Sequence, residues 1–327
     1  MSPDEPLVAT LVYVEHHEGE PVRGALGVVS KAADLGDDVT AVLCGPGVSE
    51  FASSIGGYGA GRVLVADDPA LADPVPQPRV DVLEQVVRDQ GFDTVLFAAS
   101  VLTADIAAAL AARLDAGLNW DLVDLERADG RLVGKRPALQ DSILVDVGWK
   151  RDPSLALIRS GTFEPVAKGG DAAVQKIPVE VEEWSAQTVM LEQAHEERSG
   201  PSIEDADVIV AGGRGLGSPD NFSLLEELAR ALGGAVAATR AVVDAGWYPY
   251  AAQVGQTGRT VSPKLYVACG ISGAIQHKVG MQGSGTIVAI NKDPHAPIFE
   301  YADLAVVGDL HEIIPRLTEL VRQRKTA

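Results

Sequence analysis

The chain has 327 residues, of which 46% are hydrophobic and 22% are charged, and its formal net charge is −19 at pH 7. This length suffices for two domains with separate cores, and the hydrophobic content excludes a disordered protein. The acidity argues against nucleic acid as a partner, because binding phosphates requires clustered Lys and Arg.

Membrane and metal chemistry are also disfavoured. No run of eighteen apolar residues occurs, and the start, Met-Ser-Pro-Asp-Glu-Pro, lacks the basic segment of a signal peptide, so we expect a cytoplasmic protein that is not itself membrane-embedded. Cys44 and Cys269 lie in apolar, strand-like runs without metal-ligand spacing, which predicts buried free thiols. The acidity suits either an ordinary soluble surface or a halophilic protein in a high-salt cytoplasm.

The first half alternates apolar runs of strand length with helix-like segments. We expect strands over 7–14, 39–44, 62–65 and 94–98, and helices over 21–35, 49–55, 80–89 and 103–114. Because these strands are continuously apolar, they indicate a parallel sheet that is covered on both faces, of the kind found in nucleotide-binding domains. From 119 to 184 the pattern changes to strands joined by turns, which predicts an antiparallel extension of the same domain.

A polar Gly-Pro segment over 193–204 reads as a linker between domains at 1–192 and 205–327. The second domain is expected to be a doubly wound parallel sheet, again of the α/β class. Its predicted strands and helices are, in chain order, strand 207–211, helix 218–232, strands 235–238 and 265–269, helix 273–279, strands 286–290 and 304–307, and a C-terminal helix ending near 324. Pro315 should lie at or near the first turn of that last helix.

A glycine-rich turn follows the first strand of the second domain. The spacing Gly213-x-Gly215-x-Gly217 precedes a helix, and this geometry exposes backbone N–H groups to a phosphate, although it is not the dinucleotide fingerprint. A phosphate loop and a tight turn are both compatible with this spacing. Arg214 favours the phosphate loop, because a guanidinium is a natural diphosphate ligand.

The next predicted strand ends in Thr239-Arg240, and Asp244 follows. One interpretation is a surface ion pair between Arg240 and Asp244. The other is a ligand site, which is favoured because open α/β sheets bind ligands at the carboxyl ends of their strands.

The segment 253–281 is the most informative part of the chain. A polar loop precedes an apolar strand, and a polar turn follows it; these two segments are Gln256-Thr257-Gly258-Arg259 and Ser272-Gly273-Ala274-Ile275-Gln276-His277. Glycine lets a backbone approach a ligand, while hydroxyl, amide and imidazole groups form hydrogen bonds with it. A histidine beside an apolar helix is usually structural, but its place after a Ser-Gly turn at a strand end favours binding.

Polar groups also follow the last two strands, at Asn291 and at Asp309-Leu310, where turns or helix caps would be the simpler reading. Taken together, five strand ends bring polar groups to one edge of a sheet, which predicts a site for an extended dinucleotide. No nucleophile–base pair, carboxylate pair or metal-ligand cluster accompanies them.

These motifs resemble the FAD-binding domain of the electron-transfer flavoprotein α subunit. The shared sequences run in fixed order from about 205 to the C-terminus: Gly-Gly-Arg-Gly, Thr-Arg-Ala-Val-Val-Asp-Ala-Gly, Val-Gly-Gln-Thr-Gly, Gly-Ile-Ser-Gly-Ala-Ile-Gln-His, Ala-Ile-Asn-Lys-Asp, Ala-Pro-Ile-Phe and Gly-Asp-Leu. The first domain resembles the family in its architecture and over 94–103.

The resemblance implies that FAD is the cofactor and assigns roles to particular residues. Arg214 would hold the diphosphate, Arg240 would lie over the isoalloxazine, Thr257 would donate to flavin N5, and His277 would approach the O2 side. The remaining cofactor-binding residues would be Thr239, Gln256, Gly258, Ser272, Gly273, Ala274, Ile275, Gln276, Asn291, Asp309 and Leu310. Thr239 stands where Ser is frequent in the family, and Arg259 where Lys is frequent; both keep the hydroxyl or the charge.

The family is heterodimeric, so the resemblance also implies a β subunit that shares the flavin cleft. Flavin dehydrogenases would reduce the carrier, and a membrane quinone oxidoreductase would accept its electrons; the chain would be an electron carrier rather than a self-contained enzyme. Two other functions stay open. The glycine spacing does not support a pyridine-nucleotide oxidoreductase subunit. A function as an adenine-nucleotide sensor would not explain the two polar loops on either side of 265–269.

Overall fold

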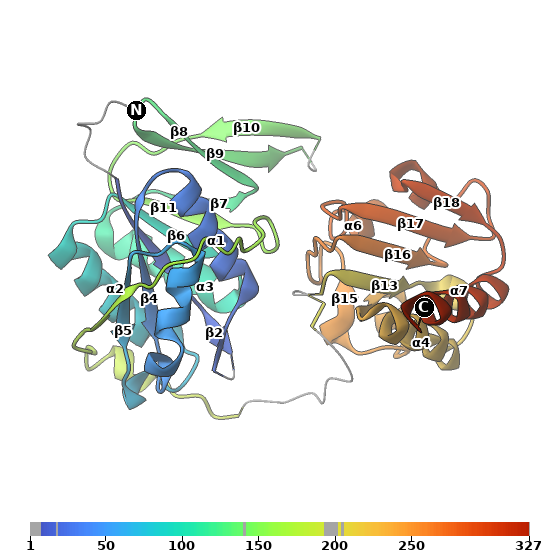
Figure 1. Ribbon diagram of the computed structural model, residues 1–327, viewed down its shortest axis with the longest axis horizontal. Helices are drawn as coiled ribbons and strands as arrows, with labels where there is room; N and C mark the ends of the chain where they lie inside the picture. The colour runs from blue at the N-terminus through green and yellow to red at the C-terminus, as the bar shows by residue number, and fades with distance from the viewer. Residues whose placement is uncertain (1–7, 18, 140–141, 193–201, 204–205, 327) are drawn as a thin grey trace. The chain divides into compact units, whose positions relative to one another are not determined.

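Figure 1 shows the computed structural model, which describes residues 8–17, 19–139, 142–192, 202–203 and 206–326. The chain divides into two compact units, Met1–Ala194 and His195–Ala327, and each contains its own parallel sheet. The predicted α/β fold class is confirmed. Apart from 202 and 203, the predicted linker over 193–204 lies outside the described residues.

The first unit is built on seven parallel strands in the order β12-β5-β4-β1-β6-β11-β7. Their bounds are β1 (Ala9–Tyr13), β4 (Asp38–Cys44), β5 (Arg62–Ala66), β6 (Thr94–Ala98), β7 (Leu118–Leu122), β11 (Ser154–Ile158) and β12 (Ala173–Lys176). Alternate strand residues face opposite layers: Val12 packs with α1 (Arg23–Asp34), whereas Leu11 packs with α2 (Pro76–Gln90) and α3 (Val101–Leu114). Burial on both faces explains why these strands are continuously apolar.

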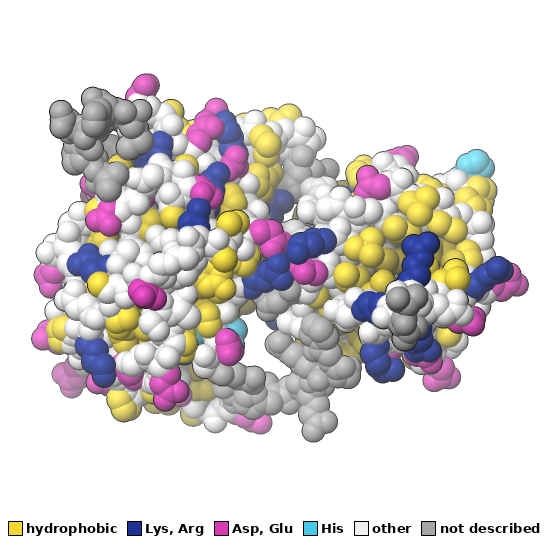
Figure 2. Space-filling view, in the orientation of Figure 1, with side chains coloured by type: hydrophobic (Ala, Val, Ile, Leu, Met, Phe, Trp, Pro, Cys, Tyr) yellow, Lys and Arg dark blue, Asp and Glu magenta, His cyan; other side chains and the backbone are white. Residues whose placement is uncertain are grey.

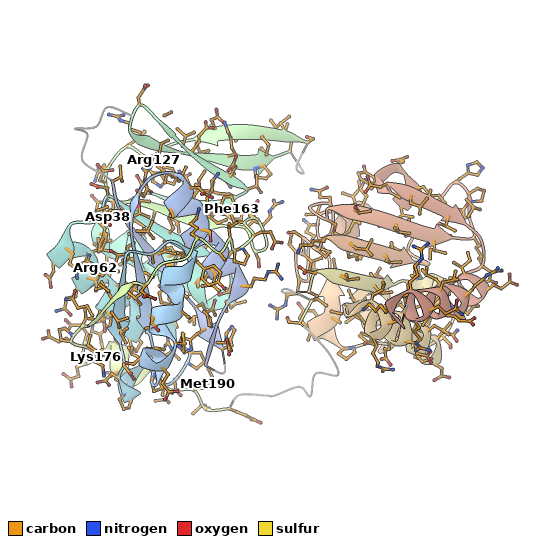
Figure 3. All side chains as sticks on the ribbon, in the orientation of Figure 1. Asp38, Arg62, Arg127, Phe163, Lys176 and Met190 are labelled. Carbon is orange, nitrogen blue, oxygen red and sulfur yellow. The ribbon has the colours of Figure 1, made fainter. Side chains whose placement is uncertain are left out.

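A separate three-stranded antiparallel sheet is formed by β8 (Asp124–Ala128), β9 (Arg131–Ala138) and β10 (Ile143–Val147). Arg127, which is labelled in Figure 3, lies on this sheet. It ties the sheet to the parallel sheet through an ion pair of 2.6 Å with the buried carboxylate of Asp37. The prediction of an antiparallel extension over 119–184 was therefore only partly right, because β7, β11 and β12 join the parallel sheet. A short ladder of β2 (His16–His17) and β3 (Glu20–Pro21) completes the described strands of this unit.

The second unit contains six parallel strands in the order β15-β14-β13-β16-β17-β18 (Figure 1). They are β13 (Val208–Gly212), β14 (Ala235–Thr239), β15 (Gln253–Val254), β16 (Leu265–Cys269), β17 (Thr286–Asn291) and β18 (Leu304–Val307). Helices α4 (Phe222–Leu232) and α7 (Leu310–Thr326) pack on one face, where Leu225 and Ile314 meet Val210 and Val267. The other face is covered by residues outside α4 and α7, such as Met281 in a turn and Ile298 in the 3-10 helix Pro297–Tyr301.

Several predicted elements differ from the structure. The helix expected over 49–55 is two 3-10 helices, Val48–Glu50 and Ala52–Tyr58, because the backbone of Phe51 leaves helical geometry between them (φ −112°, ψ 1°). The helix expected over 273–279 is only α6 (Ile275–Lys278), and neither α5 (Arg240–Val243) nor β15 was predicted. Pro315 lies inside α7 rather than at its first turn, because that helix already begins at Leu310.

Both cysteines are buried free thiols, as predicted, and burial raises the pKa of Cys44 and of Cys269 to about 12. A raised thiol pKa leaves almost no reactive thiolate near neutral pH. The two thiols are therefore core residues.

Candidate functional site

A cavity of about 690 Å³ opens at the carboxyl ends of the strands of the second unit. This volume is typical of small-molecule and cofactor sites. The sheet order reverses here, since β14 lies on one side of β13 and β16 on the other, and such switch points are where open α/β sheets bind ligands. Its lining residues from the predicted site are Arg214, Thr239, Arg240, Gln256, Thr257, Ser272, Ala274, Gln276, His277 and Asn291.

Two loops at the floor of this pocket approach each other backbone to backbone. The N–H of Gly215 donates to the carbonyl of Gly270 over 3.0 Å, and a Cβ at 215 would lie 2.6 Å from the Cα of Gly270. Gly270 itself has a φ of +63°, which side chains rarely adopt. The contact between the loops after β13 and β16 therefore requires glycine at 215 and at 270.

The loop after β15 forms a second wall. Gln253 is buried, and its amide Nε2 donates to Oγ1 of Thr257 over 3.1 Å. The Tyr250 hydroxyl donates to the Thr257 carbonyl over 3.0 Å, and the N–H of Gln256 donates to the Gln276 carbonyl over 2.7 Å. These contacts fix the position of Thr257 at the cavity.

His277 lies on the same side of the cavity and is only 6% exposed. Its Nδ1 is 3.0 Å from the Val254 carbonyl, and its Nε2 is 3.0 Å from the Tyr266 hydroxyl. Because a carbonyl can only accept, Nδ1 must carry the proton, and in the neutral ring Nε2 then accepts from Tyr266. Burial lowers the pKa of His277 to about 4, so the ring is neutral at pH 7.

Two guanidinium groups reach the cavity from different loops. No described residue forms an ion pair with Arg214, which is exposed in the loop after β13. Arg240 forms an ion pair of 3.1 Å with Asp244, and both side chains are more than 60% exposed. The expected ion pair is therefore present, and it lies at the cavity. The role of Arg240 as a ligand residue stays a prediction.

Asn291 closes the cavity at the end of β17. Its side-chain amide donates to the carbonyl of Ile271 over 2.9 Å, while its side-chain oxygen accepts from the N–H of Asp293. It thus joins the loops that follow β16 and β17, and both loops line the cavity.

Five predicted residues do not line this cavity: Gly258, Gly273, Ile275, Asp309 and Leu310. Leu310 is buried among core residues, and Asp309 accepts hydrogen bonds from His311 at the start of α7. A Cβ at Gly273 would lie 2.3 Å from the backbone nitrogen of Ile298, so that glycine serves loop packing. Lining residues that were not among the predicted site residues are Gly213, Gly215, Ala241, Asp244, Val254, Gly255, Gly270, Ile271, Asp293, Ala296 and Pro297.

Gln253 and Tyr266, which hold Thr257 and His277 from behind, were also missed. The one available sequence signal for Gln253 was its position directly before the Val-Gly-Gln-Thr-Gly motif. Among the described residues, no helix is sufficiently long and apolar to cross a bilayer, and no cluster of three or more His, Cys, Asp or Glu could hold a metal ion.

Comparison with known proteins gives matches along most of the chain. Residues 202–282 match the family model of the electron transfer flavoprotein FAD-binding domain, and residues 10–185 match that of the electron transfer flavoprotein domain. The electron transfer flavoprotein subunit alpha of Thermoanaerobacterium thermosaccharolyticum is 38% identical over 322 residues, covering 96% of this chain and 98% of that protein. The corresponding subunit of Mycobacterium leprae is 40% identical and covers 98% of this chain and 100% of its own.

The match to the FAD-binding domain spans the cavity loops from Gly213 to His277. The residues present fit a dinucleotide, because two guanidinium groups, a hydroxyl and closely packed glycine loops converge on one cavity. FAD is therefore confirmed as the cofactor. The chain belongs to the electron transfer flavoprotein α-subunit family.

Proposed function

We propose that the chain is one half of a heterodimeric electron carrier whose FAD lies in the cavity of the second unit. The convergence of polar groups from five of the strand-end loops on that cavity carries the proposal. Bound FAD supplies the electron-transfer chemistry. The chain's residues would bind and orient it: Arg214 would pair with the diphosphate, Arg240 would stabilise negative charge on the flavin, and Thr257 would donate a hydrogen bond.

The partner in this proposal is a β subunit of the same family. Apolar side chains are exposed on or beside the antiparallel sheet of the first unit, where Trp120, Leu139 and Leu144 are each more than half exposed. Trp120 contacts Arg136 on β9, and Leu144 pairs with Pro137 on the same strand, so these apolar groups lie around one strand. Apolar side chains that are exposed next to one another mark protein-binding surfaces. We assign this surface to the β subunit.

Flavin dehydrogenases would reduce the carrier, and a membrane quinone oxidoreductase would accept its electrons. The pyridine-nucleotide and adenine-sensor alternatives are less well supported, because neither accounts for Thr257 and His277 on one wall of the cavity. We also propose that the charge of −19 is an adaptation to a high-salt cytoplasm.

A visible absorption spectrum tests the function directly. The full-length chain, co-purified with its β subunit, should show a flavin spectrum with one FAD bound to this chain, and dithionite should bleach it. Replacing Arg214 and Arg240 by Ala together should weaken FAD binding. A complex that purifies without flavin, or an Arg214→Ala/Arg240→Ala variant with unchanged FAD affinity, would contradict the placement of FAD in this cavity.

Light scattering tests the partner surface. Leu144→Asp should weaken assembly with the β subunit, because it places a charge in an apolar contact. Leu191→Asp is the matched control, since Leu191 is 93% exposed and lies outside the antiparallel sheet. Equal assembly of the two variants would rule this surface out.

A further inference from the structure

Gln253 lies behind the cavity wall at the start of β15 and is only 2% exposed. Its amide Nε2 donates to Oγ1 of Thr257. Gly258 permits this arrangement, because a Cβ at 258 would lie 2.9 Å from Cγ of Gln253 and 2.3 Å from its carbonyl oxygen. The loop therefore closes tightly over the Gln253 side chain.

The direction of this hydrogen bond determines what Thr257 can offer to a ligand. An amide NH₂ group can only donate, so the Thr257 oxygen is the acceptor, and its own hydroxyl proton points elsewhere. None of the described residues accepts that proton, and Thr257 lines the cavity. The proton is thus available to an acceptor atom of the molecule that fills the cavity.

We propose that Gln253 is a positioning residue for the cofactor: it holds the Thr257 hydroxyl as a hydrogen-bond donor directed at FAD. This inference rests on the proposed placement of FAD in the cavity. His277 cannot substitute for Thr257 as a donor in this arrangement, because Tyr266 and Val254 engage both of its ring nitrogens. The buried amide of Gln253 therefore controls a donor that the neighbouring imidazole does not supply.

A double-mutant cycle tests this role on the full-length chain co-purified with its β subunit, with FAD as the probe. Gln253→Met keeps the length of the side chain but cannot donate, and Thr257→Val keeps the shape but has no hydroxyl. Each change should weaken FAD binding roughly threefold to tenfold, the range expected for one hydrogen bond. The double variant should bind FAD no more weakly than Thr257→Val, since both changes remove the same interaction.

The flavin spectrum provides a readout that loss of packing alone would not reproduce. Gln253→Met and Thr257→Val should shift the visible flavin bands in the same direction, and the shifts should not add. If Gln253→Met does not fold, Gln253→Glu replaces it at pH 8: an ionised carboxylate can only accept, so it takes the Thr257 proton and should cause the same loss of affinity.

Two results separate the proposals. Additive losses in the cycle, or a Gln253→Met chain with wild-type FAD affinity and spectrum, would overturn the role of Gln253 while leaving FAD in the cavity. A wild-type complex that binds no FAD would overturn the proposed function and this inference with it.

Discussion

The Tyr266 hydroxyl lies 3.0 Å from Nε2 of His277, and this contact completes the hydrogen bonding of the imidazole. Tyr266 is in the middle of the sheet with 0% exposure, while Nδ1 of His277 donates to Val254 on β15. The ring is thus held between two strands in one tautomer. A hydrogen bond from His277 to the O2 atom of a flavin requires the Tyr266 contact to break first.

Tyr266→Phe should therefore loosen His277 and raise its affinity for a proton. In the wild type, the Tyr266 hydroxyl donates to Nε2 of His277 and so stabilises the neutral ring. Tyr266→Phe removes this donor. We expect the free energy of unfolding to fall by about 1 kcal/mol. NMR of histidine labelled with ¹⁵N reports the protonation of both nitrogens as pH is lowered, and urea unfolding reports the stability.

Tyr248→Phe is the matched control. Tyr248 donates to Glu226 in the same unit, stacks on Phe222 and does not line the cavity. The Tyr248→Phe variant should leave the His277 resonances unchanged. If Tyr266→Phe also leaves them unchanged, the contact does not hold the imidazole in solution.

His277 should make the chain less stable in acid. Its folded pKa of about 4 lies below the ordinary value of 6.5, so the unfolded chain binds a proton more readily. The stability contributed by the neutral ring is fully present above pH 6.5 and is lost as pH falls toward 4, with a total of about 3 kcal/mol. Urea unfolding at pH 7 and pH 5 should show a smaller difference for His277→Gln than for the wild type. Equal differences would mean that His277 titrates normally in the folded chain.

The sequence predicted the cavity because its loops carry unusual residues at strand ends. Glycines beside Arg214, Thr257 and Ser272 mark positions where the backbone packs closely against a neighbouring loop. The order of the parallel strands then brings these loops to the same edge of the sheet. Asp309 and Leu310 were expected there because they follow a strand. The structure instead turns Leu310 into the core as α7 begins, which depends on how that helix packs against α4.

The supporting residues could not be predicted from local pattern. Tyr266 lies within an apolar strand and reads as an ordinary core residue; its role follows from a partner eleven residues away. The strand β15 has only two residues, and it exists because β14 pairs with it. Such pairings arise from the tertiary fold, so periodicity in the sequence does not reveal them.

Gly215→Ala should disrupt the floor of the cavity. The added Cβ would lie 2.6–2.7 Å from backbone atoms of Gly270, so one of the two loops must shift. We expect a loss of about 1–3 kcal/mol in unfolding free energy together with weaker FAD binding. Gly283→Ala is the control, because its Cβ would meet atoms no closer than 3.5 Å. Similar stability and FAD affinity in the two variants would show that the loops are not closely packed.

Salt should stabilise the chain if its acidity is a high-salt adaptation. Asp and Glu side chains are spread over the visible face of both units rather than gathered at one place (Figure 2). At low ionic strength their repulsion is long-ranged, since the Debye length is ~30 Å at 0.01 M and ~3 Å at 1 M. The melting temperature should rise steeply as KCl is added up to molar concentration. A flat profile would indicate an ordinary soluble surface.

Arg240 and Asp244 should tune the flavin potential in opposite directions. A fixed positive charge beside the ring favours the reduced, more negative flavin, whereas the paired carboxylate offsets it. A unit charge at ~4 Å contributes about 1 kcal/mol in water and about 4 kcal/mol at an effective dielectric of 20. Both side chains are more than 60% exposed, so we take roughly 1–3 kcal/mol, which corresponds to about 40–130 mV for one electron. Arg240→Ala should lower the one-electron potentials by this amount, and Asp244→Asn should raise them.

Arg240→Lys should give an intermediate value, because an ammonium keeps the charge but cannot stack on a ring as a guanidinium does. His277→Ala should change the potentials little, since the imidazole it removes is neutral and Val254 and Tyr266 engage both of its ring nitrogens. Spectroelectrochemistry on the FAD-loaded complex measures all four variants. If Arg240 is only a surface ion pair, Arg240→Ala and Asp244→Asn will both leave the potentials at the wild-type value. Opposite shifts in these two variants require that the charges of Arg240 and Asp244 both act on the flavin, and that Asp244 moderates the effect of Arg240.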